Sequence, residues 1–252
     1  MGAIDPQWLA LDGAANARVV VPGALLRSDN LQSLSPRDVR RLLHEQSLEL
    51  VIDLRTDVEV AREGPGPLAA EPAVRIEHRS LYPDAGENTD LEVDAVLPWG
   101  IDSVPEDEAE PPAVRSYLSY LRRRPDSIAA TVRGIARSRG AVLIHCAAGK
   151  DRTGVVVALA LDAVGVDRDA IVADYMATEE RIEAIVARLT SSDTYRGDVG
   201  GRDARAYAPM PDTMPRLLAL VDERHGGARA WLAANGVAEE DLQRLHARLG
   251  SG

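Results

Sequence analysis

The chain has 252 residues, 45% of them hydrophobic, which suits one large domain with a sizeable core. No apolar run reaches the ~18 residues that a membrane span needs, so no stable membrane insertion is expected. The net charge is −11, with ten acids between Asp84 and Glu110, and the absence of a basic patch with interleaved aromatics argues against nucleic acid as a partner.

The N-terminal residues, Met1 to Pro6, contain no basic segment followed by an apolar stretch, so no classical signal peptide is expected. This predicts a cytoplasmic protein, with export by a route that lacks a cleaved signal as the alternative. Cys146 is the only cysteine, which excludes an intramolecular disulfide and a zinc site made of several cysteines. Lys150 is the only lysine beside 28 arginines, and it lies four positions after Cys146.

The first predicted elements are strands and a capped helix. Residues 19–28 place β-branched residues beside a Pro-Gly turn, which predicts two strands. Ser35 is a good N-cap and Pro36 fits the first helical position, so a helix is expected to start there. Residues 48–54 are typical of a buried parallel strand, and residues 74–78 alternate as a strand does.

The middle of the chain contains an acidic segment with prolines and no regular period, from about 84 to 112. We interpret this segment as an insertion or lid. Helices are predicted near 113–121 and 127–138, and the most strand-like segment of the chain, 140–144, follows them.

The last part of the chain is predicted to be mainly helical. An apolar helix is expected over 153–164 and a longer helical segment over 167–189. Residues from about 190 to 215 are rich in Gly, Asp and Pro and are interpreted as a second loop or lid region, after which we expect a helix, a Gly-Gly turn and a helix. Because strands alternate with helices, the sequence predicts an α/β fold with a mostly parallel central sheet flanked by helices.

The segment between the strand at 140–144 and the following helix has the pattern of an anion site. A strand, a tight loop and a helix N-terminus together bind anions through backbone N–H groups. The small residues of the loop let the backbone approach the anion, and Arg152 offers two donors at once. We expect the substrate phosphate to be bound by Ala147, Ala148, Gly149, Lys150, Asp151, Arg152 and Thr153.

Cys146 is the predicted nucleophile. A helix N-terminus and nearby cations stabilise a thiolate, so the sulfur can attack without a dedicated base. Thr153 is expected to donate its hydroxyl to that sulfur, and His145 to order the loop. Asp53 and Arg55 follow a parallel strand at the edge where α/β sites assemble, and they either brace the loop by a salt bridge or contact substrate.

Three other functions are compatible with parts of this loop. A lone cysteine after a strand is usually an inert small hydrophobe. A nucleotide-binding loop would need Ser or Thr after Lys150, but the next residue is Asp151. Sulfur transfer through a persulfide is the third. The spacing of five residues from Cys146 to Arg152, with Thr153 next, favours phosphate binding over an inert cysteine and over sulfur transfer.

The run from His145 to Gly154 resembles the signature of the protein tyrosine phosphatase superfamily, and its GKDRTG form is similar to the atypical bacterial branch. Further similarity covers 22–28, 53–55 with 59–66, and 155–175, and it resumes at 226–227 with 231–232. One departure stands near the N-terminus, where the family usually has Asn-Phe-Arg-Asp and this chain has Asn-Ala-Arg-Val at 16–19. The departure affects the missing Phe and Asp, which the resemblance makes packing and loop-bracing groups, and it does not affect the nucleophile.

The resemblance implies a single phosphatase domain over 1–252 with a tyrosine-phosphatase-like fold. It implies hydrolysis of phosphotyrosine, in some members also of phosphoserine, phosphothreonine and phosphoinositides, through a phosphocysteine intermediate. The partners would be a phosphorylated protein or a phosphoinositide, with inorganic phosphate as the product, and no metal or other cofactor is expected.

The resemblance also places the general acid at Asp84, in the run Leu81-Tyr82-Pro83-Asp84. Asp151, inside the loop, is the alternative acid. A second class of function remains open at this point, a phosphate-binding module without turnover that recognises a phosphorylated partner. The intact set of Cys146, Arg152 and Thr153 favours the enzyme.

Overall fold

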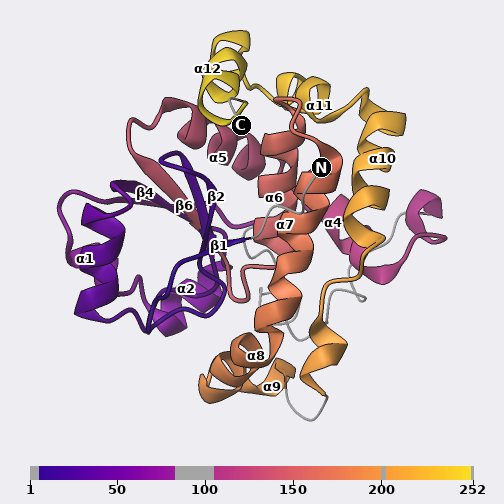
Figure 1. The fold of residues 1–252 in the computed structure, drawn as a ribbon. Helices are drawn as coiled ribbons and strands as arrows, with labels where there is room; N and C mark the ends of the chain where they lie inside the picture. The colour runs from indigo at the N-terminus through magenta and orange to yellow at the C-terminus, as the bar shows by residue number, and fades with distance from the viewer. Residues whose placement is uncertain (1–5, 83–104, 200–202, 251–252) are drawn as a thin grey trace.

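A computed structural model describes residues 6–82, 105–199 and 203–250. Six strands form one sheet in the order β1-β2-β3-β6-β4-β5 (Figure 1). The strands are β1 (Gln7–Trp8), β2 (Arg18–Val21), β3 (Leu25–Ser28), β4 (Leu48–Asp53), β5 (Arg75–His78) and β6 (Ala141–His145). The four strands from β3 to β5 in this order are parallel, and β1 and β2 add an antiparallel edge, so the predicted mostly parallel sheet is confirmed.

The register of the central strands brings polar residues together at the carboxyl ends of these strands. Strand β6 lies between β3 and β4, and its last residue, His145, stands opposite Ser28 on one side and Asp53 on the other. Because all three strands run parallel, their carboxyl ends lie side by side, and from the end of β6 the chain continues to Cys146.

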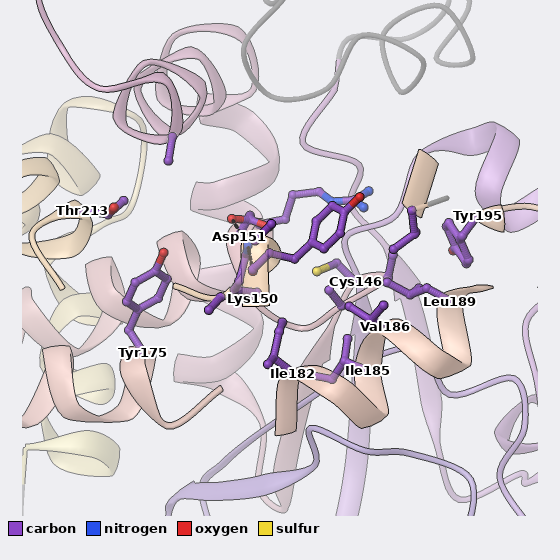
Figure 2. Close-up of a pocket in the computed structure, with 18 of the residues that line it drawn as sticks. Cys146, Lys150, Asp151, Tyr175, Ile182, Ile185, Val186, Leu189, Tyr195 and Thr213 are labelled. Atoms are coloured by element: carbon purple, nitrogen blue, oxygen red, sulfur yellow. Dashed lines mark hydrogen bonds and ion pairs between the residues drawn. The ribbon is translucent and has the colours of Figure 1, made fainter. Parts of the chain in front are cut away.

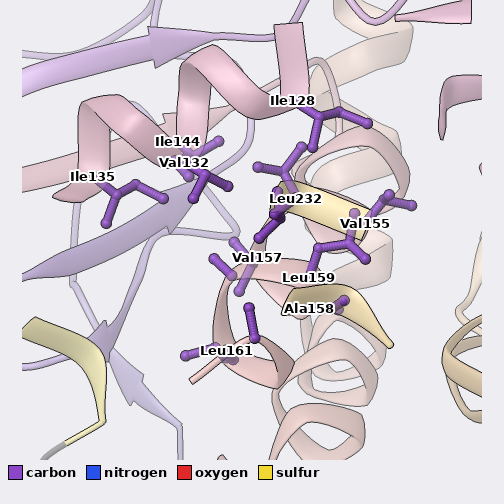
Figure 3. Packing of buried hydrophobic residues seen from close by; sticks show 14 of the residues in the cluster. Ile128, Val132, Ile135, Ile144, Val155, Val157, Ala158, Leu159, Leu161 and Leu232 are labelled. Atoms are coloured by element: carbon purple, nitrogen blue, oxygen red, sulfur yellow. The ribbon is translucent and has the colours of Figure 1, made fainter. Parts of the chain in front are cut away.

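The sheet is covered by helices on both faces because its apolar residues alternate. On one face, Leu143 of β6 clusters with Val39 and Leu42 of α1 (Pro36–His44). On the other face, Ile144 clusters with α5 (Pro125–Arg137) and α6 (Asp151–Asp162), as Figure 3 shows. The alternation follows from the period of two in a strand.

Helix starts follow the local signals in the sequence. The Ser35 hydroxyl accepts a hydrogen bond from the Asp38 N–H at the start of α1, which confirms the predicted cap. Thr56 caps α2 (Asp57–Glu63) in the same way, with Glu59 completing a reciprocal capping box. Short 3₁₀ turns follow at η1 (Pro67–Ala70) and η2 (Pro105–Asp107).

The remaining helices are α4 (Pro112–Arg123), α7 (Arg168–Met176), η3 (Ala177–Arg181), α8 (Ile182–Ser191), α9 (Arg196–Val199), η4 (Ala204–Tyr207), α10 (Thr213–His225), α11 (Ala228–Ala234) and α12 (Glu239–Leu249). In Figure 1, α4, α7, α10 and α11 lie near α6, α12 lies by α5, and α8 and α9 lie at the bottom of the view. None of the helices in the described part of the chain has the length and hydrophobicity needed to cross a membrane.

Three sequence expectations need adjustment. The helical segment predicted over 167–189 is divided by η3, where the buried Thr178 hydroxyl accepts hydrogen bonds from Asn16 and Arg18. The single helix expected after the Gly-Gly turn is two helices, because Gly236 adopts φ +86 between them. The second loop region contains the short helices α9 and η4. Residues 84–104 of the acidic segment lie outside the described residues.

Candidate active site

The loop between β6 and α6 has its carbonyl groups tied to surrounding elements. The Ala147 carbonyl accepts from the Asn30 N–H at 3.0 Å, and the Ala148 carbonyl accepts from Asn16 Nδ2 at 2.9 Å. The Gly149 carbonyl accepts from Arg27 Nη2 at 2.7 Å. These bonds come from β3, from the loop after β3 and from the segment between β1 and β2, and they fix the orientation of three successive peptide groups.

With the carbonyls held this way, the loop N–H groups stay open. Within 6–82, 105–199 and 203–250, no residue accepts a hydrogen bond from the backbone N–H of Ala147 to Thr153. The first N–H to bond back is that of Gly154, which reaches the Lys150 carbonyl at 2.9 Å. A row of open donors at the start of α6 is the arrangement that binds an anion.

Gly149 is required for the course of the loop. It adopts φ +67, and a Cβ added there would lie 2.4 Å from the Ser28 carbonyl oxygen. Any side chain would therefore push the loop away from β3.

Cys146 lies at the floor of a pocket of about 280 Å³. Cys146 is 2% exposed. Figure 2 shows its sulfur between the loop residues Lys150 and Asp151 and the apolar side chains of α8. The wall opposite the loop is apolar and is made by Ile182, Ile185, Val186 and Leu189 of α8 with Tyr195, Val199, Tyr207 and Met210. The pocket thus combines an anion-binding floor with an apolar wall.

Arg152 is held by a carboxylate that sequence reasoning missed. Its Nη1 donates to Glu59 Oε2 at 2.5 Å and its Nη2 to Oε1 at 3.1 Å, while its guanidinium lies 5.6 Å from the centre of the Tyr82 ring. Burial lowers the pKa of Arg152, but the charges of Glu59 and Cys146 outweigh it and raise that pKa. Arg152 therefore carries a fixed positive charge beside Cys146.

Asp53 and Arg55 form a buried pair behind the loop. Arg55 Nε lies 2.9 Å from Asp53 Oδ1, and Arg55 Nη2 lies 2.6 Å from Oδ2. His145 Nε2 is 3.7 Å from Asp53 Oδ1. Burial raises the pKa of Asp53, but His145 and Arg55 more than offset it and hold the pKa well below its usual value. None of the three lines the pocket, which favours bracing of the loop over substrate contact.

Two charged loop residues face the pocket. Asp151 Oδ1 accepts a hydrogen bond from the Tyr117 hydroxyl at 2.6 Å and lies 3.6 Å from Lys150 Nζ. Lys150 Nζ donates to the Tyr207 carbonyl of η4 at 2.6 Å, so it joins the loop to the second loop region. Asp84, the other candidate acid, lies outside the described residues.

Thr153 is fully buried, and its hydroxyl has no hydrogen-bond partner among the described residues. Its donation to the Cys146 sulfur therefore stays a prediction. In the Asn-Ala-Arg-Val run, the two polar residues brace the site: Asn16 binds the Ala148 carbonyl, and Arg18 Nε binds Asp174 Oδ1 at 2.8 Å.

A cysteine that opens a loop of free backbone N–H donors, between a parallel strand and a helix, is the arrangement of cysteine-based phosphatases. The profile of the tyrosine phosphatase family matches residues 11–251. The triple specificity protein phosphatase PtpB of Mycobacterium tuberculosis is 30% identical over 269 aligned positions, which cover 94% of this chain and 95% of that protein. A tyrosine-protein phosphatase of Nostoc commune is 30% identical over 254 positions, covering 97% of this chain and 80% of that protein. The chain belongs to the tyrosine phosphatase family, and the predicted resemblance is confirmed.

Proposed function

We propose that this protein-tyrosine phosphatase hydrolyses phosphate monoesters through a covalent phosphocysteine on Cys146. The observation that carries this proposal is the position of Cys146 at the pocket floor, beside open backbone N–H groups and the guanidinium of Arg152. Donors fixed before the substrate arrives stabilise the charge that develops on a transferring phosphoryl group. No metal is needed for this chemistry, because Arg152 and the helix N-terminus supply the positive field.

The reaction divides into two displacements. In the first, the Cys146 sulfur attacks phosphorus, the ester P–O bond breaks, and the leaving oxygen takes a proton from a carboxylic acid. In the second, water attacks phosphorus and gives its proton to the same carboxylate. The S–P bond then breaks, and inorganic phosphate leaves with the thiolate restored.

We propose Asp151 as the acid to test first, and Asp84, which lies outside the described residues, stays the other candidate. Asp151 lines the pocket together with Cys146 and Arg152, within the loop that holds the phosphate. An acid must reach the leaving oxygen, and a residue of the loop is already beside it. The choice is tested with Asp151→Asn and Asp84→Asn, measured on aryl phosphates of graded leaving-group acidity. The variant of the true acid loses roughly 10²–10⁴-fold on poor leaving groups and little on good ones.

The shape of the pocket supports phosphotyrosine as a substrate. Apolar residues of α8 face the loop across the pocket, which suits a flat apolar ring ending in a phosphate. One relative is named a triple specificity protein phosphatase, which supports substrates beyond phosphotyrosine for this chain. Phosphoserine, phosphothreonine and phosphoinositides are the further substrates that the sequence resemblance implies.

Phosphate release distinguishes the enzyme from a binding module that recognises a phosphorylated partner. Purified protein is expected to release phosphate from a tyrosine-phosphorylated peptide. Rapid quenching in acid is expected to trap a phosphorylated form that is absent from Cys146→Ser. Tight binding of the peptide by the unmodified protein without any phosphate release would support the binding module instead.

A further inference from the structure

Two buried tyrosines outside the loop form a chain of hydrogen bonds that ends at Asp151. Tyr117 of α4 lies 2.6 Å from Asp151 Oδ1 through its hydroxyl, and that hydroxyl lies 2.9 Å from the hydroxyl of Tyr175 of α7. Tyr117 is 0% exposed and Tyr175 is 2% exposed. The three residues come from three different helices and meet at the first position of α6.

The direction of these hydrogen bonds follows from the protons available. The hydroxyl of Tyr117 donates its single proton to Asp151. Tyr175 must then donate to Tyr117, because the Tyr117 oxygen can only accept in that second bond. The chain of donation therefore runs from Tyr175 to Tyr117 to Asp151, and each hydroxyl fixes the rotation of the next.

The bond with Tyr117 also distinguishes the two oxygens of Asp151. Both contacts made to this carboxyl group within the described part of the chain, from Tyr117 and from Lys150, go to Oδ1. Oδ2 is the oxygen left to carry a proton. A carboxyl group on a helix N-terminus can rotate freely unless a partner holds it, and a fixed acid transfers its proton with a smaller entropy loss.

We propose that Tyr117, oriented by Tyr175, is a positioning residue that holds Asp151 with Oδ2 available for proton transfer to the leaving group. This inference rests on the proposed function, in which Asp151 is the acid. Burial raises the pKa of Tyr117, and the charge of Asp151 raises it further, so Tyr117 remains a proton donor over the whole working range.

The test is Tyr117→Phe, measured as kcat/KM on a series of aryl phosphates whose leaving phenols range from strongly to weakly acidic. kcat/KM includes every step up to departure of the leaving group, so it reports protonation of that group. We expect a loss of roughly tenfold on the poorest leaving group and almost none on the best, so that the dependence on leaving-group acidity becomes steeper than in the unmodified enzyme. Tyr175→Phe should steepen the dependence less, because it removes the second bond of the chain.

Two matched variants separate positioning from packing. Tyr120→Phe removes a hydroxyl of the pocket lining one turn further along α4, whose partner is Tyr82 at 3.3 Å, and it should steepen the leaving-group dependence less than Tyr117→Phe does, because no hydrogen bond to Asp151 is lost. Thr131→Val removes a buried hydroxyl on α5, outside the pocket lining, and calibrates the loss of thermal stability. If Tyr117→Phe unfolds well below Thr131→Val, Tyr175→Phe carries the test.

The outcomes also separate this inference from the assignment of the acid. If Asp151→Asn steepens the leaving-group dependence and Tyr117→Phe and Tyr175→Phe do not, the positioning role is overturned while the proposed function stands. If Asp151→Asn itself leaves the dependence unchanged, Asp151 is not the acid and the role of Tyr117 falls with it. Steepening by Asp151→Asn and a smaller steepening by Tyr117→Phe would establish the role.

Discussion

The guanidinium of Arg152 and the carboxylate of Glu59 meet through two parallel hydrogen bonds, of 2.5 Å and 3.1 Å. Glu59 is itself fixed, because its Oε2 also accepts from the Thr56 N–H at 2.7 Å in the capping box of α2. The cap of one helix therefore sets the orientation of the arginine at the start of another.

Glu59→Gln should weaken both stability and catalysis. The variant leaves the buried Arg152 without its countercharge, and breaking a buried ion pair in this way costs roughly 3–5 kcal/mol of unfolding free energy. kcat/KM should fall roughly 10- to 100-fold, because a misplaced arginine stabilises the transition state poorly. Urea unfolding and steady-state kinetics measure the two effects. A variant as active as the unmodified enzyme would show that Arg152 finds its position without Glu59.

Arg152→Lys should be nearly inactive although the charge is kept. Lysine cannot make two parallel bonds to Glu59 or to two phosphate oxygens. Binding of vanadate, followed by titration calorimetry, should weaken together with kcat. If vanadate still binds as tightly as in the unmodified enzyme, the phosphate is held by the backbone N–H groups alone.

Lys150→Ala should act selectively on substrates. The ammonium lies at the pocket, bound to the Tyr207 carbonyl, and a substrate with a second anionic group can compete for it. Hydrolysis of a phosphoinositide should therefore fall more than hydrolysis of a small aryl phosphate. Lys150→Met, which keeps the length of the stem, controls for packing. An equal loss on every substrate would assign Lys150 to the structure of the loop.

Alkylation of Cys146 should abolish activity at one equivalent. It is the only thiol, so the mass shift and the loss of activity report the same atom. Because the open N–H groups surround the sulfur, phosphate or vanadate in the pocket should protect against iodoacetate. Residual activity after complete alkylation would exclude Cys146 as the nucleophile.

Acid should unfold the protein through the buried carboxylates of the site. Burial raises the pKa of Glu59, but the charge of Arg152 and its hydrogen bonds outweigh burial, and the pKa of Glu59 lies below its usual value, as does that of Asp53. A lowered pKa contributes stability that is fully present above the unfolded values of about 4 and is lost as the pH falls below them. Unfolding free energy, measured in urea, should be level between pH 7 and about 6 and fall below about 5. The fall should be shallower in Glu59→Gln.

The anion-binding loop could be predicted because its signals are local. A β-branched strand, small loop residues and an arginine at a fixed spacing lie within residues 140–154, and the sheet order around them follows from alternating strands and helices. The capped start of α1 was predictable for the same reason.

The residues that orient the loop could not be predicted in this way, because their partners are distant in the chain. Glu59 stands 93 positions from Arg152, and in the sequence it has the pattern of an ordinary capping residue. Tyr117 stands 34 positions from Asp151, with no spacing that indicates the contact. Arg27 and Asn16 similarly depend on how β3 and its neighbouring loop pack against the site.

The floor and the wall of the pocket belong to separate parts of the chain. The floor is formed by one continuous unit, strand β6, the loop after it and helix α6, which lies inside the core. The apolar wall is formed by helix α8 and the segments that follow it in the chain. Selection can therefore alter the wall, and with it the range of substrates, while leaving the chemistry of phosphate transfer untouched. Sequence differences among such enzymes are then expected to accumulate along α8. The same helix is the place to introduce substitutions that change the substrate range of this phosphatase.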